Sequence, residues 1–138
     1  MITPTDSTGT SEGSTSPDMA GISLERIKQR RDFLHVAEGA GWQTPGFILQ
    51  GRRRTACNRE GLIRIGFTCS RKVGNAVVRN RARRRLAHAA DIVLPHHGIP
   101  GWDYVMIGLR FRTVSRNFAK LTQDLETAVR RLAHKEMR

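Results

Sequence analysis

The chain has 138 residues, and its 24 Lys and Arg residues against 12 Asp and Glu residues give a formal net charge of +12. This length favours one domain, and a hydrophobic content of 38% is enough for a modest core. No stretch approaches the ~18 consecutive apolar residues of a membrane span, and no secretory signal pattern begins the chain. Cys57 and Cys69 form neither a disulfide framework nor a zinc-binding Cys pair. We therefore expect a cytoplasmic protein that does not bind membranes.

The first 22 residues differ in composition from the rest of the chain. They are rich in Ser, Thr, Gly and Pro, and they contain Asp6, Glu12 and Asp18 but no Lys or Arg. Such a segment cannot offset its ordering entropy by burying apolar surface. We therefore predict a disordered acidic and polar tail over residues 1–22 and a folded domain over residues 23–138, which carries all of the positive charge.

The first half of the domain predicts one helix and two strands. Residues 31–38 have apolar side chains at helical spacing and are followed by glycines, which indicates a short helix. Residues 47–50 predict a strand that leads into a basic loop. The pattern near residues 52–58 is compatible with either a loop or a further short strand. Residues 62–69 alternate between apolar and other side chains, which is typical of a half-buried strand.

The second half predicts two long helices separated by a strand. After a polar connection over residues 70–75, a helix is expected from residue 76 to residue 93, ended by Pro95. Residues 104–109 form a nearly continuous apolar run, which predicts a strand covered on both faces, and residues 116–134 predict the final helix. The expected fold is a single small α/β (α+β) sandwich, with a mixed sheet of about four strands covered by helices.

The most informative stretch runs from Ser70 to Arg85. It contains seven Lys and Arg residues and no Asp or Glu. A solvated helix face normally interleaves both signs of charge, so this density favours a phosphate-binding face over a plain solvent-exposed one. Arginine also suits bidentate phosphate contacts and stacking on exposed bases. We expect a nucleic acid as the partner rather than an anionic membrane surface.

Motifs for catalysis are weak by comparison. Residues 66–73 resemble a phosphate-binding P-loop, but Arg71 stands where that motif requires Gly and Val73 where it requires Ser or Thr. His96 and His97 are adjacent in an expected loop, and residues 61–90 contain no Asp or Glu. If RNA is cleaved, we expect the catalytic groups to come from another molecule.

The basic stretch resembles a known signature. The motif Arg64-x-Gly66 and the run SRKVGNAVVRNRARR over residues 70–84 are similar to the signature of the bacterial ribonuclease P protein family. The similarity extends over residues 23–133, because three further segments look like the first-helix, first-strand and last-strand motifs of that family: Arg31-Asp32-Phe33, Phe47-Ile48-Leu49 and Asp103–Ile107.

The resemblance implies a fold, partners and site residues. The family fold contains a left-handed βαβ crossover at the Arg-rich helix, against the usual right-handed rule. Its protein binds a catalytic RNA that removes the 5′ leader of precursor tRNA with Mg²⁺ ions held mainly by the RNA subunit and the substrate. No catalytic residue or metal ligand is then expected in the protein. The implied RNA-binding residues are Arg64, Arg71, Lys72, Asn75, Arg79, Asn80, Arg81, Arg83 and Arg84.

The resemblance also implies a cleft for the single-stranded leader between the first helix and the sheet, at Phe33 and Phe47. From the residues alone, ordinary core packing is the favoured role of these two side chains, and stacking on unpaired bases is the alternative. Two other functions stay open at this point. One is a structural RNA-binding protein of the ribosomal type with no role in catalysis. The other is a DNA-binding module, although Asn80 stands alone among arginines as a reader of base edges.

Overall fold

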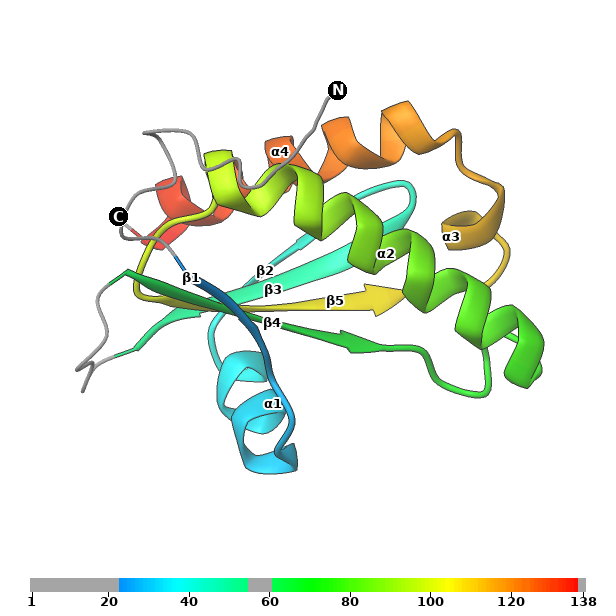
Figure 1. Ribbon diagram of the computed structural model, residues 1–138, viewed down its shortest axis with the longest axis horizontal. Coiled ribbons are helices and arrows are strands. Elements are labelled where there is room, and N and C mark those ends of the chain that lie inside the picture. Colours follow the sequence, from blue (N-terminus) through cyan, green and yellow to red (C-terminus); the bar gives the residue numbers. More distant parts are fainter. Residues whose placement is uncertain (1–22, 55–60, 137–138) are drawn as a thin grey trace, which may run out of the picture.

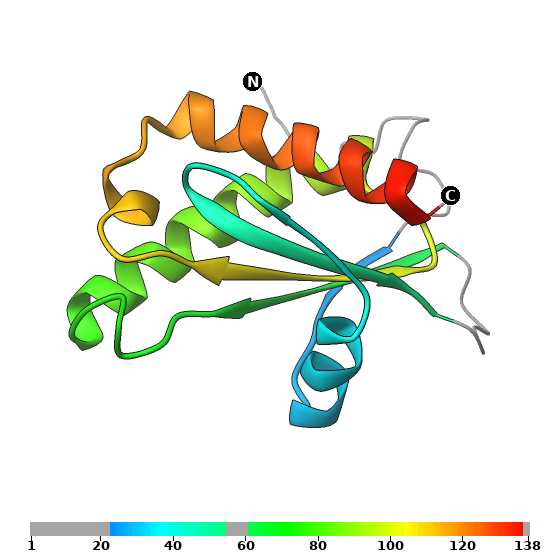
Figure 2. The same cartoon turned by 180° about the vertical axis from the view of Figure 1, so that it is seen from behind.

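A computed structural model describes residues 23–54 and 61–136, and the predicted tail over residues 1–22 lies outside this range. Its elements are β1 (Ser23–Arg26), α1 (Arg30–Ala37), β2 (Ala40–Gln43), β3 (Phe47–Arg53), β4 (Leu62–Thr68), α2 (Ala76–His97), β5 (Trp102–Gly108), α3 (Arg112–Ser115) and α4 (Phe118–Glu136). The strands form one sheet in the order β1-β4-β5-β3-β2. Helix α1 covers one face of this sheet, and α2 and α4 cover the other (Figures 1 and 2).

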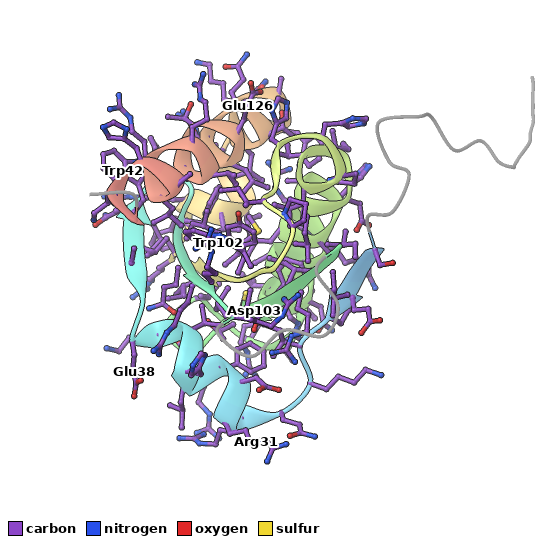
Figure 3. The ribbon with its side chains drawn as sticks, turned by 90° about the vertical axis from the view of Figure 1, so that its left-hand side faces the viewer. Arg31, Glu38, Trp42, Trp102, Asp103 and Glu126 are labelled. Atoms are coloured by element: carbon purple, nitrogen blue, oxygen red, sulfur yellow. The ribbon has the colours of Figure 1, made fainter. Side chains whose placement is uncertain are left out.

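The central strand β5 distributes its side chains to two different layers. Trp102, Tyr104 and Met106 belong to the main core with α2 and α4. Val105 belongs to a smaller apolar cluster with Val36 of α1. Figure 3 shows the same alternation at the start of the strand, with Trp102 on the α2 side and Asp103 on the α1 side. The nearly continuous apolar run was correctly predicted as a strand covered on both faces.

The connection from β4 through α2 to β5 is a left-handed crossover. The two strands are parallel neighbours. In Figure 1 both run to the right, β1 lies at the front edge of the sheet, and α2 returns to the left above the sheet. Figure 2 shows β2 and β3 at the opposite edge, so β5 lies behind β4 in Figure 1. A right-handed crossover, which is the rule for such units, would have placed α2 on the same face as α1.

The sheet has five strands rather than about four, because two short edge strands were not predicted. β1 and β2 have four residues each and are largely exposed, so neither carries a strong period-two apolar pattern. β3 is longer than predicted: residues 51–53 pair with β5 instead of forming a loop. The strand left open near residues 52–58 is thus in part the end of β3, and residues 55–60 lie outside the described range.

Helix α2 continues past the predicted end at residue 93. Pro95 lies inside its last turn. A proline removes only its own N–H from the helix ladder, and the N–H of Gly98 still donates to the carbonyl oxygen of Leu94 at 2.8 Å. The helix therefore ends at His97 and not before the proline. The other predicted helices and the strand after residue 62 are confirmed to within a few residues.

Candidate nucleic-acid interface

The loop before α2 fixes where the basic helix begins. Gly74 has φ +153°, and a Cβ atom at this position would lie 2.8 Å from Cβ of Val78, so the close approach requires glycine. The side-chain oxygen of Asn75 accepts a hydrogen bond from the backbone N–H of Val78 at 3.0 Å. Asn75 is therefore the N-cap of α2, which gives this predicted RNA-binding residue a structural role as well.

Small and apolar residues attach one side of α2 to the core. Ala82, Leu86, Ala89 and Ala90 are fully buried. Among the polar residues of the same helix segment, Asn80, Arg81, Arg83 and Arg84 are exposed, whereas Arg79 is half-buried. With two exposed residues of the preceding loop, these cations form a group that we call the α2 basic surface: Arg71, Lys72, Arg79, Arg81, Arg83 and Arg84.

The α2 basic surface has no carboxylate partners within residues 23–54 and 61–136. Among the ion pairs formed by the described residues, none involves a member of this surface. Arg83 donates instead to the side-chain oxygen of Asn80 at 2.5 Å. The Nε atom of Arg79 is buried and has no hydrogen-bond partner in the part of the chain that the structure describes. Like charges at this spacing repel each other, so a polyanion placed on this side would relieve the repulsion.

Arg85 is the exception within the basic run. Its guanidinium donates to the backbone oxygen of Thr113 at 2.9 Å and to that of Arg116. It also lies 5.7 Å from the ring centroid of Phe118. These contacts fasten α2 to the segment between β5 and α4. Sequence alone does not distinguish Arg85 from its neighbours, because its partners lie about thirty residues further along the chain.

Arg64 lies on the opposite face of the sheet from the α2 basic surface. It makes a bidentate pair with Asp103, with Nε to Oδ1 at 2.9 Å and Nη2 to Oδ2 at 2.6 Å. A longer contact of 3.4 Å reaches Asp32 of α1. Hydrogen bonding to Asp103 raises the pKa of Arg64 above its ordinary value. This predicted RNA-binding residue is therefore engaged with two carboxylates and not grouped with the other predicted residues.

Arg54, which the sequence analysis did not single out, completes this network. Its Nη1 atom lies 2.6 Å from Oδ1 of Asp103, and its Nη2 atom donates to the backbone oxygen of Leu62 at 2.6 Å. The network ties the end of β3 to the start of β4 and β5. A buried carboxylate shared by two arginines is a structural arrangement, because its charge is already satisfied.

The expectation that Phe33 and Phe47 line one cleft is corrected by the structure. Phe47 is fully buried in the core between the sheet, α2 and α4. Phe33 is half-buried on the other face, packed against the cluster of Ile27 and Val105. Successive residues of a strand point to opposite faces, and Phe47 points away from α1. Phe47 therefore offers no surface to a nucleic acid, whereas Phe33 can still do so.

The described residues do not form a metal site. They contain no group of three or more His, Cys, Asp or Glu side chains placed to hold an ion. Asp32 and Asp103, which face each other across Arg64, are both engaged with that guanidinium. His97 faces Glu126 at 3.8 Å. These carboxylates therefore do not fit a Mg²⁺ ion.

None of the helices in the described ranges is long and apolar enough to span a bilayer.

Comparisons with known proteins agree with this geometry. The sequence profile of the family described as Ribonuclease P matches residues 23–133. The ribonuclease P protein component of Ruegeria pomeroyi is 51% identical, over 82% of this chain and 88% of the relative. That of Paramagnetospirillum magneticum is 47% identical, over 79% of this chain and 83% of the relative.

Solved structures show the same fold at lower identity. The ribonuclease P protein of Staphylococcus aureus aligns with a TM-score of 0.61 at 24% identity, covering 78% of this chain and 94% of that one. The protein from Thermotoga maritima aligns with a TM-score of 0.59 at 24% identity, covering 77% and 96%. With the profile and the curated relatives, these matches lead to one conclusion: the chain belongs to the bacterial ribonuclease P protein family, the RNA-binding protein component of an endoribonuclease that processes tRNA.

Proposed function

We propose that the α2 basic surface binds the catalytic RNA of ribonuclease P, while the α1 face of the sheet holds the 5′ leader of precursor tRNA. The observation that carries this proposal is a cluster of cations, all but Arg79 exposed, without carboxylate partners among the described residues. Family membership favours this function over a structural ribosomal-type protein and over a DNA-binding module. The Mg²⁺ that the family uses in general would be held by the RNA and the substrate.

Electrostatics explains what such a protein contributes to cleavage. Two RNA molecules must approach each other closely, and their phosphates repel. Cations on α2 neutralise phosphates and release condensed counterions, which drives binding and makes it depend on salt. Holding the leader then places the scissile bond at a fixed position relative to the RNA. The protein acts by position and charge, and no bond-breaking step requires one of its side chains.

The α1 face has features suited to a single strand. Phe33 is half-buried there beside Gly66, whose missing Cβ leaves room for the ring. Gln50 and Ile107 are also half-buried on this face. An aromatic ring next to partly exposed apolar and polar groups can stack on a base without reading its sequence. We propose Phe33 as the leader contact, without Phe47.

Reconstitution at low Mg²⁺ concentration tests the function as a whole. Catalytic RNA alone should cleave precursor tRNA slowly at low Mg²⁺, and adding the protein should restore cleavage. The added protein should not change the affinity of the catalytic RNA for mature tRNA, because mature tRNA has no leader for the protein to hold. If the protein bound the RNA tightly but left cleavage unchanged at every Mg²⁺ concentration, a purely structural role would replace this proposal.

A double substitution tests the α2 basic surface directly. Arg79→Ala with Arg83→Ala should weaken RNA binding and flatten its salt dependence by about 0.7–0.9 log units per lost phosphate contact. The matched control is Arg53→Ala with Arg130→Ala, which removes the same charge from exposed positions outside this surface. Equal slopes for the two double variants would reject the assigned surface.

A further inference from the structure

Phe111 is an aromatic residue that the fold exposes. Its side chain lies just before α3 and is 69% exposed. A phenylalanine usually stabilises a protein by burying its ring, and this ring gains little of that benefit from its own chain. The guanidinium of Arg110 lies 4.8 Å from the ring centroid. The ring is therefore presented to solvent beside a cation.

The backbone at Phe111 is also strained. Its φ is +63° with ψ −42°, and the N–H of Arg112 donates to the carbonyl oxygen of Arg110 at 2.7 Å. This is a γ-turn with positive φ at its centre, a rare and strained conformation. For a bulky residue such a φ is an outlier that glycine or asparagine would adopt more easily. The chain keeps an aromatic side chain where the backbone disfavours it.

Buried hydrogen bonds hold this turn in place. Thr113 is fully buried, and its hydroxyl donates to the backbone oxygen of Gly46 at 2.6 Å. The same hydroxyl accepts from the N–H of Leu109 at 2.8 Å. Arg85 of α2 donates to the carbonyl oxygen of Thr113 at 2.9 Å. Strained residues persist where their surroundings determine them in this way, and they concentrate at functional sites.

A pocket lies directly beside the strained turn. It has a volume of about 570 Å³ and is lined by the loop before α2 and the residues that lead into α3. Phe111 and Val114 supply apolar wall, and Arg71, Lys72 and Arg110 supply positive charge. Figure 1 shows why these segments meet, since α3 lies next to the N-terminal half of α2. Because Arg71 and Lys72 belong to both, the pocket is continuous with the α2 basic surface.

We propose that this pocket binds one unpaired nucleotide of the catalytic RNA, with its base stacked on Phe111 and its phosphate held by Arg71 and Lys72. The inference rests on the proposed function of the α2 basic surface and adds a specific contact to it. Three features favour a nucleotide: an exposed aromatic ring, adjacent cations and a volume suited to a small ligand. Cations alone would bind any polyanion, whereas the ring adds a surface on which a base can stack.

The experiment compares variants of Phe111 in the full-length chain, with its cognate catalytic RNA as the probe. Phe111→Gly removes the ring and relaxes the turn, so the melting temperature should stay the same or rise. The Kd for the RNA should rise about tenfold, because base–aromatic stacking is lost. The slope of log K against log salt should not change, because no phosphate contact is lost. Phe111→Tyr keeps an aromatic ring at this position, so its Kd for the RNA should equal that of wild type.

The matched control is Ile92→Ala, which trims another exposed apolar side chain of the same domain far from the pocket along α2. Its Kd should equal that of wild type. A Kd of Phe111→Gly within twofold of wild type would overturn the proposal, and so would a Phe111→Tyr variant as weak as Phe111→Gly. If only the KM for precursor tRNA rose, the pocket would belong to the substrate. Failure of the wild-type chain to bind the RNA would overturn the proposed function itself.

Discussion

Replacing Asp103 by asparagine would remove the central charge of the network on the α1 face. The Asp103 side chain is 2% exposed and accepts hydrogen bonds from Arg54 at 2.6 Å and from Arg64 at 2.9 and 2.6 Å. An asparagine keeps one acceptor oxygen and turns an NH₂ donor toward a guanidinium. Two cations would then face each other without the carboxylate that neutralises them.

The expected cost follows from what each arginine keeps. Breaking a buried ion pair by removing one partner costs about 3–5 kcal/mol. Arg54 retains the backbone oxygens of Leu62 at 2.6 Å and Trp102 at 3.1 Å, and Arg64 retains Asp32 at 3.4 Å. These remaining contacts favour the lower end of that range, about 3 kcal/mol. Such a loss is a large part of the ~5–15 kcal/mol by which a domain is stable.

Urea unfolding monitored by circular dichroism measures this cost. The matched control is Glu38→Gln, because Glu38 also pairs with an arginine, Arg52, at 3.1 Å but is largely exposed. An exposed pair contributes at most about 1 kcal/mol. If Asp103→Asn lowered the free energy of unfolding no more than Glu38→Gln does, the network would be no stronger than a surface ion pair. The structural role assigned to the pair between Arg64 and Asp103 would then lose its support.

Two further predictions concern the two faces of the sheet. Phe47→Leu should lower the free energy of unfolding by about 1–2 kcal/mol, since it trims a fully buried ring, but leave the KM for precursor tRNA unchanged. Gly66→Ala would bring a Cβ to 2.5 Å from Cε1 of Phe33. It should displace that ring, cost about 1–3 kcal/mol, and raise the KM for precursor tRNA without changing the affinity for the catalytic RNA.

Gly41→Ala is the control for Gly66→Ala, because its added Cβ would meet only the carbonyl oxygen of Leu49 at 3.8 Å. A raised KM for Phe47→Leu in protein that is fully folded would restore Phe47 to the leader site. An unchanged KM for Gly66→Ala, despite a measured loss of stability, would remove Phe33 from it.

Local patterns were sufficient to predict the central elements. The alternation after Leu62 predicted β4, and the polar connection over residues 70–75 indicated where α2 begins. Short elements such as β2 were missed. Gly41 was interpreted as part of a helix end, because its pairing with Gln50 of β3 cannot be seen in the sequence. The end of α2 was missed because a proline is tolerated in a last turn that still closes at Gly98.

The site was harder to predict because its decisive contacts are distant in sequence. The sequence does not distinguish Arg64 from the other arginines, because its partner Asp103 lies 39 residues further along the chain. Phe33 and Phe47 were grouped because the family resemblance implied a cleft between the first helix and the sheet. The sheet separates them, and a strand covered on both faces does not reveal from its sequence which face meets which helix.

The hand of the β4–α2–β5 connection also has an energetic consequence. With α2 on the far side of the sheet from α1 (Figure 1), the layer that carries Arg79 and the layer that carries Phe33 are separated by a packed partition of β strands. Substitutions at sites that far apart, with no shared partners, usually combine additively. Under the proposed function, substitutions that change the affinity for one RNA should therefore have little effect on the affinity for the other.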